Sequence, residues 1–263
     1  MYNKYILFII VIIILIIYLS VRRIIQRFYF VPNHSILSTK FTIEKIGNHS
    51  ALVKKGVNNN KCLLISHGNA GNITFRDGLF TNLKQYNGDI YCYEYPSFSN
   101  IDGKLTINNC IDQHLFWLKY LENKYPQIDL WGESIGGGII TETIAKLNPK
   151  KKENKMILNK INRIYLQSTF SSISNIIQHI SKILYFFYKL LLLDDLNTIK
   201  NLAHPNFYKI KITQFHSKND EIIPFSEVIQ INNSCKKNGL EYQFIEIGGT
   251  HNNPIFPKNL LFT

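Results

Sequence analysis

The sequence predicts an α/β domain with a mostly parallel central sheet flanked by helices, preceded by one amino-terminal transmembrane helix. Three observations lead to this prediction. Apolar runs with strand character alternate with amphipathic helical segments, the first residues form a long apolar segment without charge, and 263 residues suit one domain with a short extension. We therefore expect a membrane anchor at residues 1–27 and a single domain at residues 28–263.

The amino-terminal anchor is the apolar segment at residues 5–21 (YILFIIVIIILIIYLSV), whose length is near the lower limit of about 17 residues for a membrane-spanning helix. The alternatives are a cleaved signal peptide and a buried core helix. A signal peptide has a shorter apolar region and then small residues at the cleavage site, whereas Arg22 and Arg23 follow directly here. We expect an uncleaved, single-pass anchor.

Orientation of the anchor follows from the charges beside it. Arg22, Arg23 and Arg27 follow the apolar segment, against Lys4 and the amino terminus before it. An excess of basic residues marks the cytoplasmic side, so the domain after the anchor is expected in the cytosol. The margin is small, and the opposite orientation remains an alternative.

The predicted elements of the domain follow one another in alternation. Strands are expected at residues 41–47, 50–55, 61–66, 89–95, 128–131, 161–167, 209–216 and 241–247. Helices are expected from Thr106 to near Pro126, and at residues 135–147 and 225–238, with Thr106 as the N-cap of the first. Residues 149–155 (PKKKENK) are expected to form a solvated loop.

A second apolar stretch, at residues 173–193, is predicted to be helical. It is a candidate for another membrane span, but Gln178, His179, Lys182 and Lys189 interrupt it. Charged residues inside a span are rare, so a core helix or a lid helix over a binding site is favoured. Such a helix can also dip into the surface of a bilayer.

Composition limits the partners that we expect. The formal charge is +12, but the lysines are scattered and no recognition helix accompanies them, so no nucleic-acid partner is expected. A basic surface suits an anionic membrane. The cysteines are too few and scattered for a disulfide framework, and none lies in a C-x-x-C pair, so no metal site is predicted. They are Cys62, Cys92, Cys110 and Cys235.

Residues 132–136 (GESIG) match the pattern G-x-S-x-G between a predicted strand and a predicted helix. A sharp turn of this kind holds a serine in a strained backbone conformation, and side chains at the glycine positions would collide with neighbouring backbone. The turn also places Ser134 at the amino terminus of a helix, where the dipole favours negative charge. Ser134 is therefore the candidate nucleophile.

A serine hydroxyl is a weak nucleophile and needs a base, which in turn needs an acid to orient it. Downstream of Ser134, Asp220 (in HSKNDEIIP) and His251 (in GGTHNNP) follow predicted strands, at the edge where active sites of open parallel sheets assemble. These two are the preferred acid and base. The competing residues are Glu221, Asp194 and Asp195 as acid, and His179, His204 and His216 as base.

Acyl transfer also needs backbone donors for the oxyanion of the tetrahedral intermediate. The N–H of Ile135, just after the nucleophile, is one candidate. The other lies in the loop of residues 67–72 (HGNAGN), with Asn69 as first choice and Ala70 as second. His67, in the same loop, is expected to be a structural hydrogen-bonding residue.

The motifs HGNAGN, GESIGGG, HSKNDEIIP and GTHNNP together resemble those of the alpha/beta-hydrolase superfamily, and in particular its membrane-anchored domain-containing proteins of the type numbered thirteen. The resemblance covers about residues 41–254. It implies the alpha/beta-hydrolase fold, a triad of Ser134, Asp220 and His251, and hydrolysis of an ester, thioester or amide without a cofactor. One departure is residues 95–100 (YPSFSN), which replace a turn that usually contains glycine.

The sequence therefore predicts a membrane-anchored serine hydrolase that acts on an ester or thioester of a lipid-like or acylated substrate. The alternative is a catalytically silent, membrane-tethered scaffold or interaction protein of the same fold. The anchor at residues 5–21 is the expected membrane contact in both interpretations.

Overall fold

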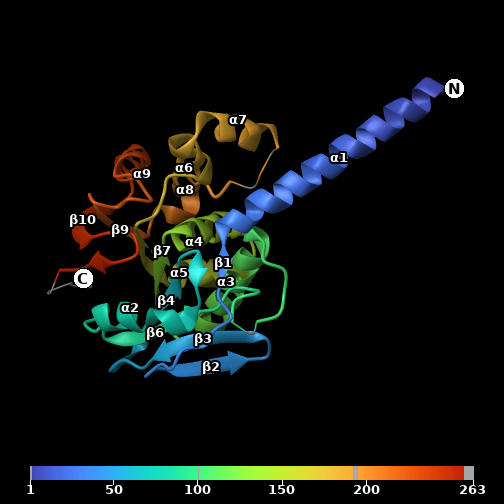
Figure 1. Cartoon of the computed structure of the whole chain (residues 1–263). Coiled ribbons are helices and arrows are strands. Elements are labelled where there is room, and N and C mark those ends of the chain that lie inside the picture. The colour runs from blue at the N-terminus through green and yellow to red at the C-terminus, as the bar shows by residue number, and fades with distance from the viewer. Residues whose placement is uncertain (1, 100, 192, 194, 258–263) are drawn as a thin grey trace.

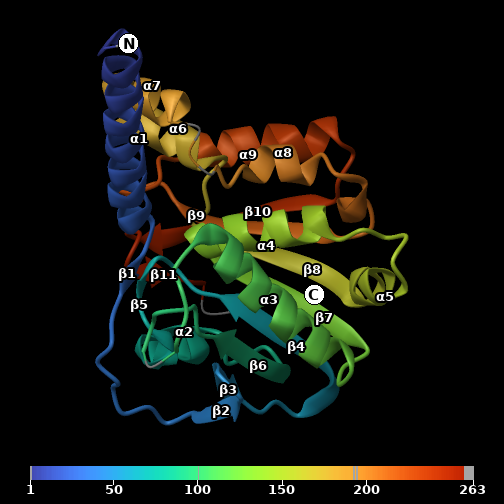
Figure 2. The same cartoon turned by 90° about the vertical axis from the view of Figure 1, so that its right-hand side faces the viewer.

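The computed structural model of the chain describes residues 2–99, 101–191, 193 and 195–257. A long helix, α1 (Tyr2–Tyr29), projects from a layered domain in which helices lie against a central sheet (Figures 1 and 2). Within α1, the segment Lys4–Arg23 has a mean hydropathy of 2.8 and is not buried by the rest of the chain. It is the one helix among the described residues that is long and apolar enough to cross a membrane.

The central sheet has the strand order β11-β10-β9-β8-β7-β4-β6-β3-β2 in the described chain. Neighbours from β10 to β6 pair in parallel, and β2, β3 and β11 are antiparallel to their neighbours. The bounds are β2 (Thr42–Ile46), β3 (His49–Lys54), β4 (Asn58–Ser66), β6 (Gly88–Tyr93), β7 (Gln127–Glu133), β8 (Ile161–Gln167), β9 (Lys211–Ser217), β10 (Tyr242–Gly249) and β11 (Pro254–Ile255). A separate short pair joins β1 (Val31–Pro32) to β5 (Ala70–Gly71).

The helices of the domain cover both faces of this sheet. Their bounds are α2 (Asp77–Asn82), α3 (Ile107–Glu122), α4 (Ile135–Lys146), α5 (Lys152–Lys160), α6 (Ile173–Ile180), α7 (Lys182–Leu190), α8 (Thr198–Leu202) and α9 (Ser226–Lys237), with short 3-10 turns η1 (Ile73–Arg76) and η2 (Pro205–Phe207). Thr106 caps α3 as predicted, because its Oγ1 accepts a hydrogen bond from the N–H of Asn109 at 3.1 Å.

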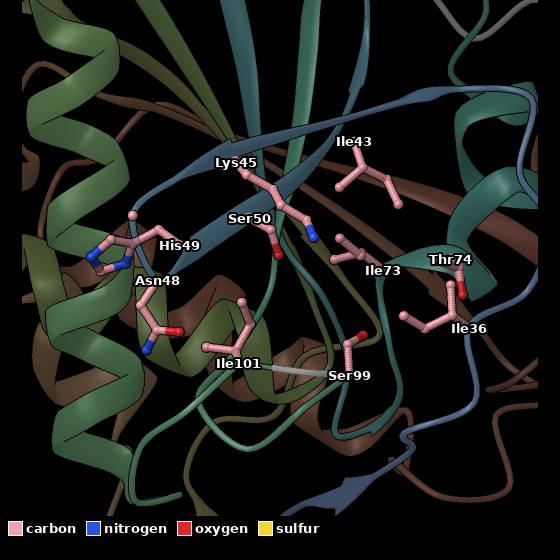
Figure 3. A pocket seen from close by; sticks show the side chains of 11 residues that line it. Ile36, Ile43, Lys45, Asn48, His49, Ser50, Ile73, Thr74, Ser99 and Ile101 are labelled. Atoms are coloured by element: carbon pink, nitrogen blue, oxygen red, sulfur yellow. The ribbon is translucent and has the colours of Figure 1, made fainter.

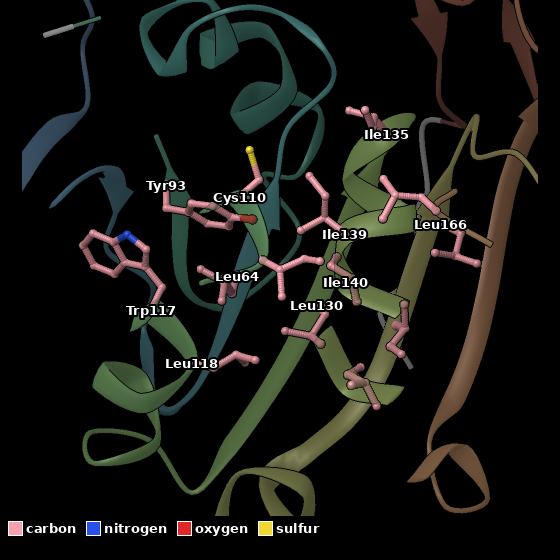
Figure 4. Packing of buried hydrophobic residues seen from close by; sticks show 14 of the residues in the cluster. Leu64, Tyr93, Cys110, Trp117, Leu118, Leu130, Ile135, Ile139, Ile140 and Leu166 are labelled. Atoms are coloured by element: carbon pink, nitrogen blue, oxygen red, sulfur yellow. The ribbon is translucent and has the colours of Figure 1, made fainter. Parts of the chain in front are cut away.

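Two buried clusters, one on each face of the sheet, form the core. On β4, Leu63 and Ile65 belong to the cluster beneath α2, and Leu64 belongs to the cluster beneath α3 and α4 (Figure 4). Successive side chains of a strand point to opposite faces, so a strand buried on both faces reads as a continuous apolar run. This is why the central strands were predictable without an alternating pattern.

Two helical segments differ from the predictions. The stretch predicted as one helix at residues 173–193 is two helices, because Ser181 is extended (φ −162°, ψ 125°), ends α6 and caps α7 with its side chain. Its residue 192 lies outside the described part. Residues 149–155 are also not all loop: α5 begins at Lys152, has Glu153 in its first turn and buries Ile157. An acidic residue in the first turn and one buried apolar residue are enough to stabilise a short helix at this position.

Candidate active site

The nucleophile elbow lies between β7 and α4. Ser134 has φ 53° and ψ −115°, a left-handed backbone conformation that is unfavourable for a residue with a Cβ. Its N–H donates to the carbonyl of Gln167 at 2.8 Å, which ties the turn to the neighbouring strand. A Cβ on Gly132 would lie 2.4 Å from the Cα of Gly137, and one on Gly136 would lie 2.0 Å from the carbonyl oxygen of Ser66. The two glycines of the motif are therefore required by backbone that approaches closely.

The predicted acid and base meet at the carboxyl ends of neighbouring parallel strands, β9 and β10. His251 Nδ1 lies 2.9 Å from Asp220 Oδ2 and 3.0 Å from Oδ1. The N–H groups of Ile222 and Ile223 donate to Asp220 Oδ1 at 3.0 and 2.8 Å. Glu221 accepts instead from the backbone N–H of His251 at 3.0 Å, so it supports the loop and leaves the imidazole to Asp220.

The electrostatics of this pair favour an ionised carboxylate. Burial by itself raises the pKa of Asp220, but the hydrogen bonds from His251 and from the Ile223 N–H outweigh it, and the pKa lies below its usual value. The side chain of Asp220 is fully buried and that of His251 is only 9% exposed. With Nδ1 directed at the carboxylate, Nε2 is the imidazole nitrogen available to a reacting group.

The predicted oxyanion loop is held from inside by a buried carboxylate, Glu94. Glu94 Oε1 lies 3.2 Å from His67 Nε2, and Oε2 accepts from the N–H of Ile73 at 3.1 Å and from the hydroxyl of Ser99 at 2.6 Å. His67 is buried, and its Nδ1 lies 2.8 Å from the carbonyl of Gly68. Glu94 was not predicted as a site residue, although one carboxylate at the end of an aromatic-rich apolar strand is a signal that could have found it.

The segment that joins α1 to β2 holds the same loop from outside. The N–H of Val31 donates to the carbonyl of Asn69 at 2.7 Å within the β1–β5 pair. The side-chain amide of Asn72 donates to the carbonyls of Asn33 and Ser35 at 2.9 and 2.8 Å. The chain directly after the long helix is thus part of the wall of the site.

A cavity of about 460 Å³ brings most of these residues together. It is lined by Ser134, His251 and Asn69, and also by Arg76 and Glu133. Arg76 Nε lies 3.5 Å from Glu133 Oε2, so an ion pair forms part of the cavity wall. Arg76 was not predicted as a pocket residue, because only the fold brings the 3-10 turn η1 next to the elbow. Glu133 lies within the predicted elbow motif, but its side chain was not predicted to line the pocket. Ile135 does not line the cavity; it is the first residue of α4, directly after Ser134.

The other candidate acids and bases from the sequence make contacts elsewhere in the structure. Asp195 accepts from the N–H and hydroxyl of Ser174, and Asp194 lies outside the described residues. His179 contacts Glu227, and His204 caps the turn η2. His216 is the nearest competitor: its Nε2 is bound to the carbonyl of Ile223 at 2.9 Å and lies 3.6 Å from Asp220. Burial lowers the pKa of His216, which keeps it neutral.

The described part of the turn that departs from the usual glycine pattern, residues 95–99, has two serines with left-handed backbone. Ser97 and Ser99 have φ values of 64° and 50°. Ser97 Oγ donates to the carbonyl of Gly103 at 2.6 Å, and the N–H of Ser99 donates to the carbonyl of Asn33 at 3.2 Å. These hydrogen bonds offset the cost of the left-handed conformation.

A second cavity, of about 140 Å³, lies between the β2–β3 hairpin and the loop that holds Ser99 (Figure 3). Lys45 and Ser50 extend toward it from the hairpin, and Ile73 and Ile101 form apolar walls. It shares no lining residue with the larger cavity. Among the described residues, no group of three or more His, Cys, Asp or Glu side chains is arranged to hold a metal ion.

Comparisons with known proteins agree with this geometry at the level of the fold. No protein-family model matches the chain. An uncharacterized protein of Acanthamoeba polyphaga mimivirus is 28% identical over 229 residues, which cover 81% of this chain and 74% of that protein.

Solved structures of hydrolases superpose on most of the chain at low identity. An esterase from Pyrococcus furiosus is 13% identical with a TM-score of 0.59, covering 84% of this chain and 88% of its own. A thermophilic esterase from Thermogutta terrifontis is 12% identical with a TM-score of 0.59, covering 80% and 82%. Mouse alpha/beta hydrolase domain-containing protein 10 is 13% identical with a TM-score of 0.53, covering 81% and 91%. The chain therefore has the alpha/beta-hydrolase fold, as its motifs predict.

Proposed function

We propose that this chain is a membrane-anchored serine hydrolase that cleaves an ester or thioester bond in a lipid-like or acylated substrate. One observation carries the proposal: Ser134, in a strained elbow, lines the same cavity as His251, whose Nδ1 is hydrogen-bonded to Asp220. The esterases among the solved structures of the same fold support an ester-cleaving activity.

In the proposed mechanism, His251 Nε2 takes the proton of the Ser134 hydroxyl while Oγ attacks the carbonyl carbon of the substrate. The Asp220 carboxylate, whose pKa is lowered, stabilises the imidazolium that forms. The tetrahedral intermediate collapses to an acyl-enzyme, and the alcohol or thiol leaves with the proton from His251. A water molecule, activated by the same imidazole, then releases the acid and restores Ser134.

The oxyanion of each tetrahedral intermediate needs preorganised donors. The N–H of Ile135 is the first candidate, because the first N–H groups of α4 have no partner within the helix. The backbone N–H of Asn69 is the second, in the loop that Glu94 supports and to which the Val31 N–H is bound. Each such donor contributes about 10²–10³ in kcat in enzymes of this type.

Membrane anchoring belongs to the same proposal. The span Lys4–Arg23 is exposed from Lys4 to Ile17 and has the length of a transmembrane helix. A single pass with the hydrolase domain in the cytosol follows from the basic residues after it. Protease protection of the full chain in microsomes tests this orientation: a domain that is digested without detergent supports it, and a protected domain reverses it.

An active-site probe tests the hydrolase. We expect a fluorophosphonate to label the full chain in detergent, and Ser134→Ala to abolish the labelling. Ser97→Ala is the matched control, because Ser97 also has a positive φ but does not line the cavity, and it should label like the parent. Equal labelling of Ser134→Ala would contradict the proposal. If the parent is not labelled and cleaves no acyl ester or thioester of any chain length while a protein co-purifies, the scaffold alternative is supported.

A further inference from the structure

Helices α6 and α7 form a hairpin (residues 173–190, the α6–α7 hairpin) with an unusual exposed surface. Six large apolar side chains on it are between 48% and 72% exposed. They are Ile180, Ile183, Leu184, Phe186, Phe187 and Leu190. A contiguous apolar surface of this kind marks an interaction site or a membrane contact in most proteins.

The hairpin contacts the long helix α1 near the end of the candidate span. The hydroxyl of Tyr18, in the long helix α1, donates to the carbonyl of Leu191 at 2.9 Å, directly after α7. Figures 1 and 2 both show α6 and α7 at the end of the domain from which α1 projects, away from the β2–β3 end of the sheet. Tyr18 is partly buried there, whereas the apolar side chains before it in the span are exposed. The carboxyl end of the hairpin therefore lies next to the candidate membrane span at Tyr18.

The depth of this contact suits a helix that lies in the membrane surface. Tyr18 precedes Arg23, the end of the span, by five residues, which at 1.5 Å per residue is about 7–8 Å. Interfacial helices bury their apolar face about 5–10 Å into the headgroup and acyl boundary. The exposed Lys182 and Lys189 at the two ends of α7 are long enough to reach anionic headgroups from this depth.

The hairpin is not itself built to cross a bilayer. Ser181 interrupts it with extended backbone, and α6 and α7 have 8 and 9 residues, whereas a span needs about 17 or more. The first N–H groups of a helix have no partner within it, and a helix start of this kind is tolerated at the interface and not among lipid-facing residues of the hydrocarbon core.

We propose that the α6–α7 hairpin is a second membrane contact, an interfacial one, which lies in the headgroup region of the bilayer that α1 spans. Two contacts limit the rotation and tilt of the domain, whereas one helix would leave it free. The catalytic cavity is lined by Val31 and Pro32, just after α1 ends at Tyr29, so its wall lies about 10–15 Å from the end of the span. A substrate held in the bilayer is then within reach of Ser134.

This inference rests on the anchoring part of the proposed function, and the experiment separates the two. The native cysteines are all buried, so a cysteine introduced at an exposed position can be labelled selectively with a polarity-sensitive fluorophore. Three variants of the full chain are compared in phosphatidylcholine–phosphatidylserine vesicles: Phe187→Cys in α7, Ile10→Cys within the span, and Val57→Cys, which is 94% exposed in the loop between β3 and β4. Quenchers are lipids that carry a spin label near the headgroup or near the end of the acyl chain.

We expect the emission of the Phe187→Cys label to shift to the blue and to be quenched most by the shallow spin label. The Ile10→Cys label should be quenched most by the deep spin label. The Val57→Cys label should be quenched by neither. A Phe187→Cys label that behaves like the Val57→Cys label, with Ile10→Cys still quenched, would overturn the interfacial contact but not the anchor. A blue-shifted Phe187→Cys label that no lipid quenches would overturn it too, in favour of a protein partner. No quenching of Ile10→Cys would overturn the anchor and this inference together.

Discussion

Helices α4 and α7 are both rich in large apolar side chains, yet they end in opposite environments. In α4, Ile139, Ile140 and Ile144 are completely buried between the sheet and the neighbouring helices. In α7, only Tyr188 is buried, and the other large side chains project from the domain. An apolar composition therefore indicates that a helix needs a nonpolar environment, and the position in the fold decides whether the rest of the domain supplies it. For α7 it does not, and we propose that the bilayer does.

The largest expected loss of stability comes from a substitution in the elbow at the start of α4. Gly136→Ala places a Cβ 2.0 Å from the carbonyl oxygen of Ser66, which is backbone and cannot move aside. We expect a loss of more than about 4 kcal/mol of stability, seen as failure to purify folded protein or as a collapse of the thermal transition. The matched control is Gly78→Ala in α2, where nothing lies within 4 Å of a new Cβ. It should stay within about 1 kcal/mol of the parent.

Removal of one charge in the buried region should affect activity and leave the fold intact. Asp220→Asn keeps the shape of the side chain and loses the carboxylate that orients His251 Nδ1. We expect kcat to fall about 10³–10⁴-fold for a short-chain acyl ester, because the neutral amide favours the wrong tautomer and does not stabilise the imidazolium. The exposed Asp112 serves as a control, and Asp112→Asn should keep the parent rate. A fall of less than tenfold in Asp220→Asn would remove Asp220 from the proposed triad.

The contrast between the two helices can be measured directly with one type of substitution. Ile140→Ala in α4 deletes a side chain that is completely buried, and we expect a cost of about 2–5 kcal/mol. Ile183→Ala in α7 deletes one that is 71% exposed, and its cost in detergent should be within about 0.5 kcal/mol. Urea unfolding of both variants in the same detergent gives the comparison. Equal costs would mean that α7 is buried in solution.

A smaller effect should appear in the pH dependence of stability. His114 in α3 is fully buried, with Nδ1 3.2 Å from Ser66 Oγ, and burial lowers its pKa to about 3. Between that value and the unfolded pKa of about 6.5, the unfolded chain binds more protons than the folded chain. The contribution of the neutral, buried His114 to the free energy of unfolding is therefore fully present above pH 6.5 and declines as the pH falls below it. The decline is about 2 kcal/mol from pH 7 to pH 5.

We expect His114→Gln to flatten this decline, measured as the free energy of unfolding at the two pH values. His216, whose pKa burial also lowers, accounts for a remaining slope of the same sign. His34→Gln, at an exposed position, should keep the slope of the parent. A slope that is unchanged in His114→Gln would mean that water reaches this part of the core.

Local patterns were enough to predict the alternation of strands and helices, the cap at Thr106 and the elbow around Ser134. Each of these depends on residues within a few positions of one another: the two-residue period of a strand, the side-chain oxygen before a helix, the glycines beside the nucleophile. The positions of Asp220 and His251 after their strands were also predictable, because the carboxyl ends of parallel strands meet at one edge.

What the sequence by itself determined is therefore the fold class, the apolar span and the candidate site. Only the tertiary structure decided that Asp220, and not Glu221, faces the imidazole, that Glu94 and the segment after α1 hold the loop of Asn69, and that Arg76 reaches Glu133. It also broke the apolar stretch at Ser181 and left α7 exposed beside α1. These contacts join residues far apart in the chain, and the direction of each side chain depends on packing that no local pattern records.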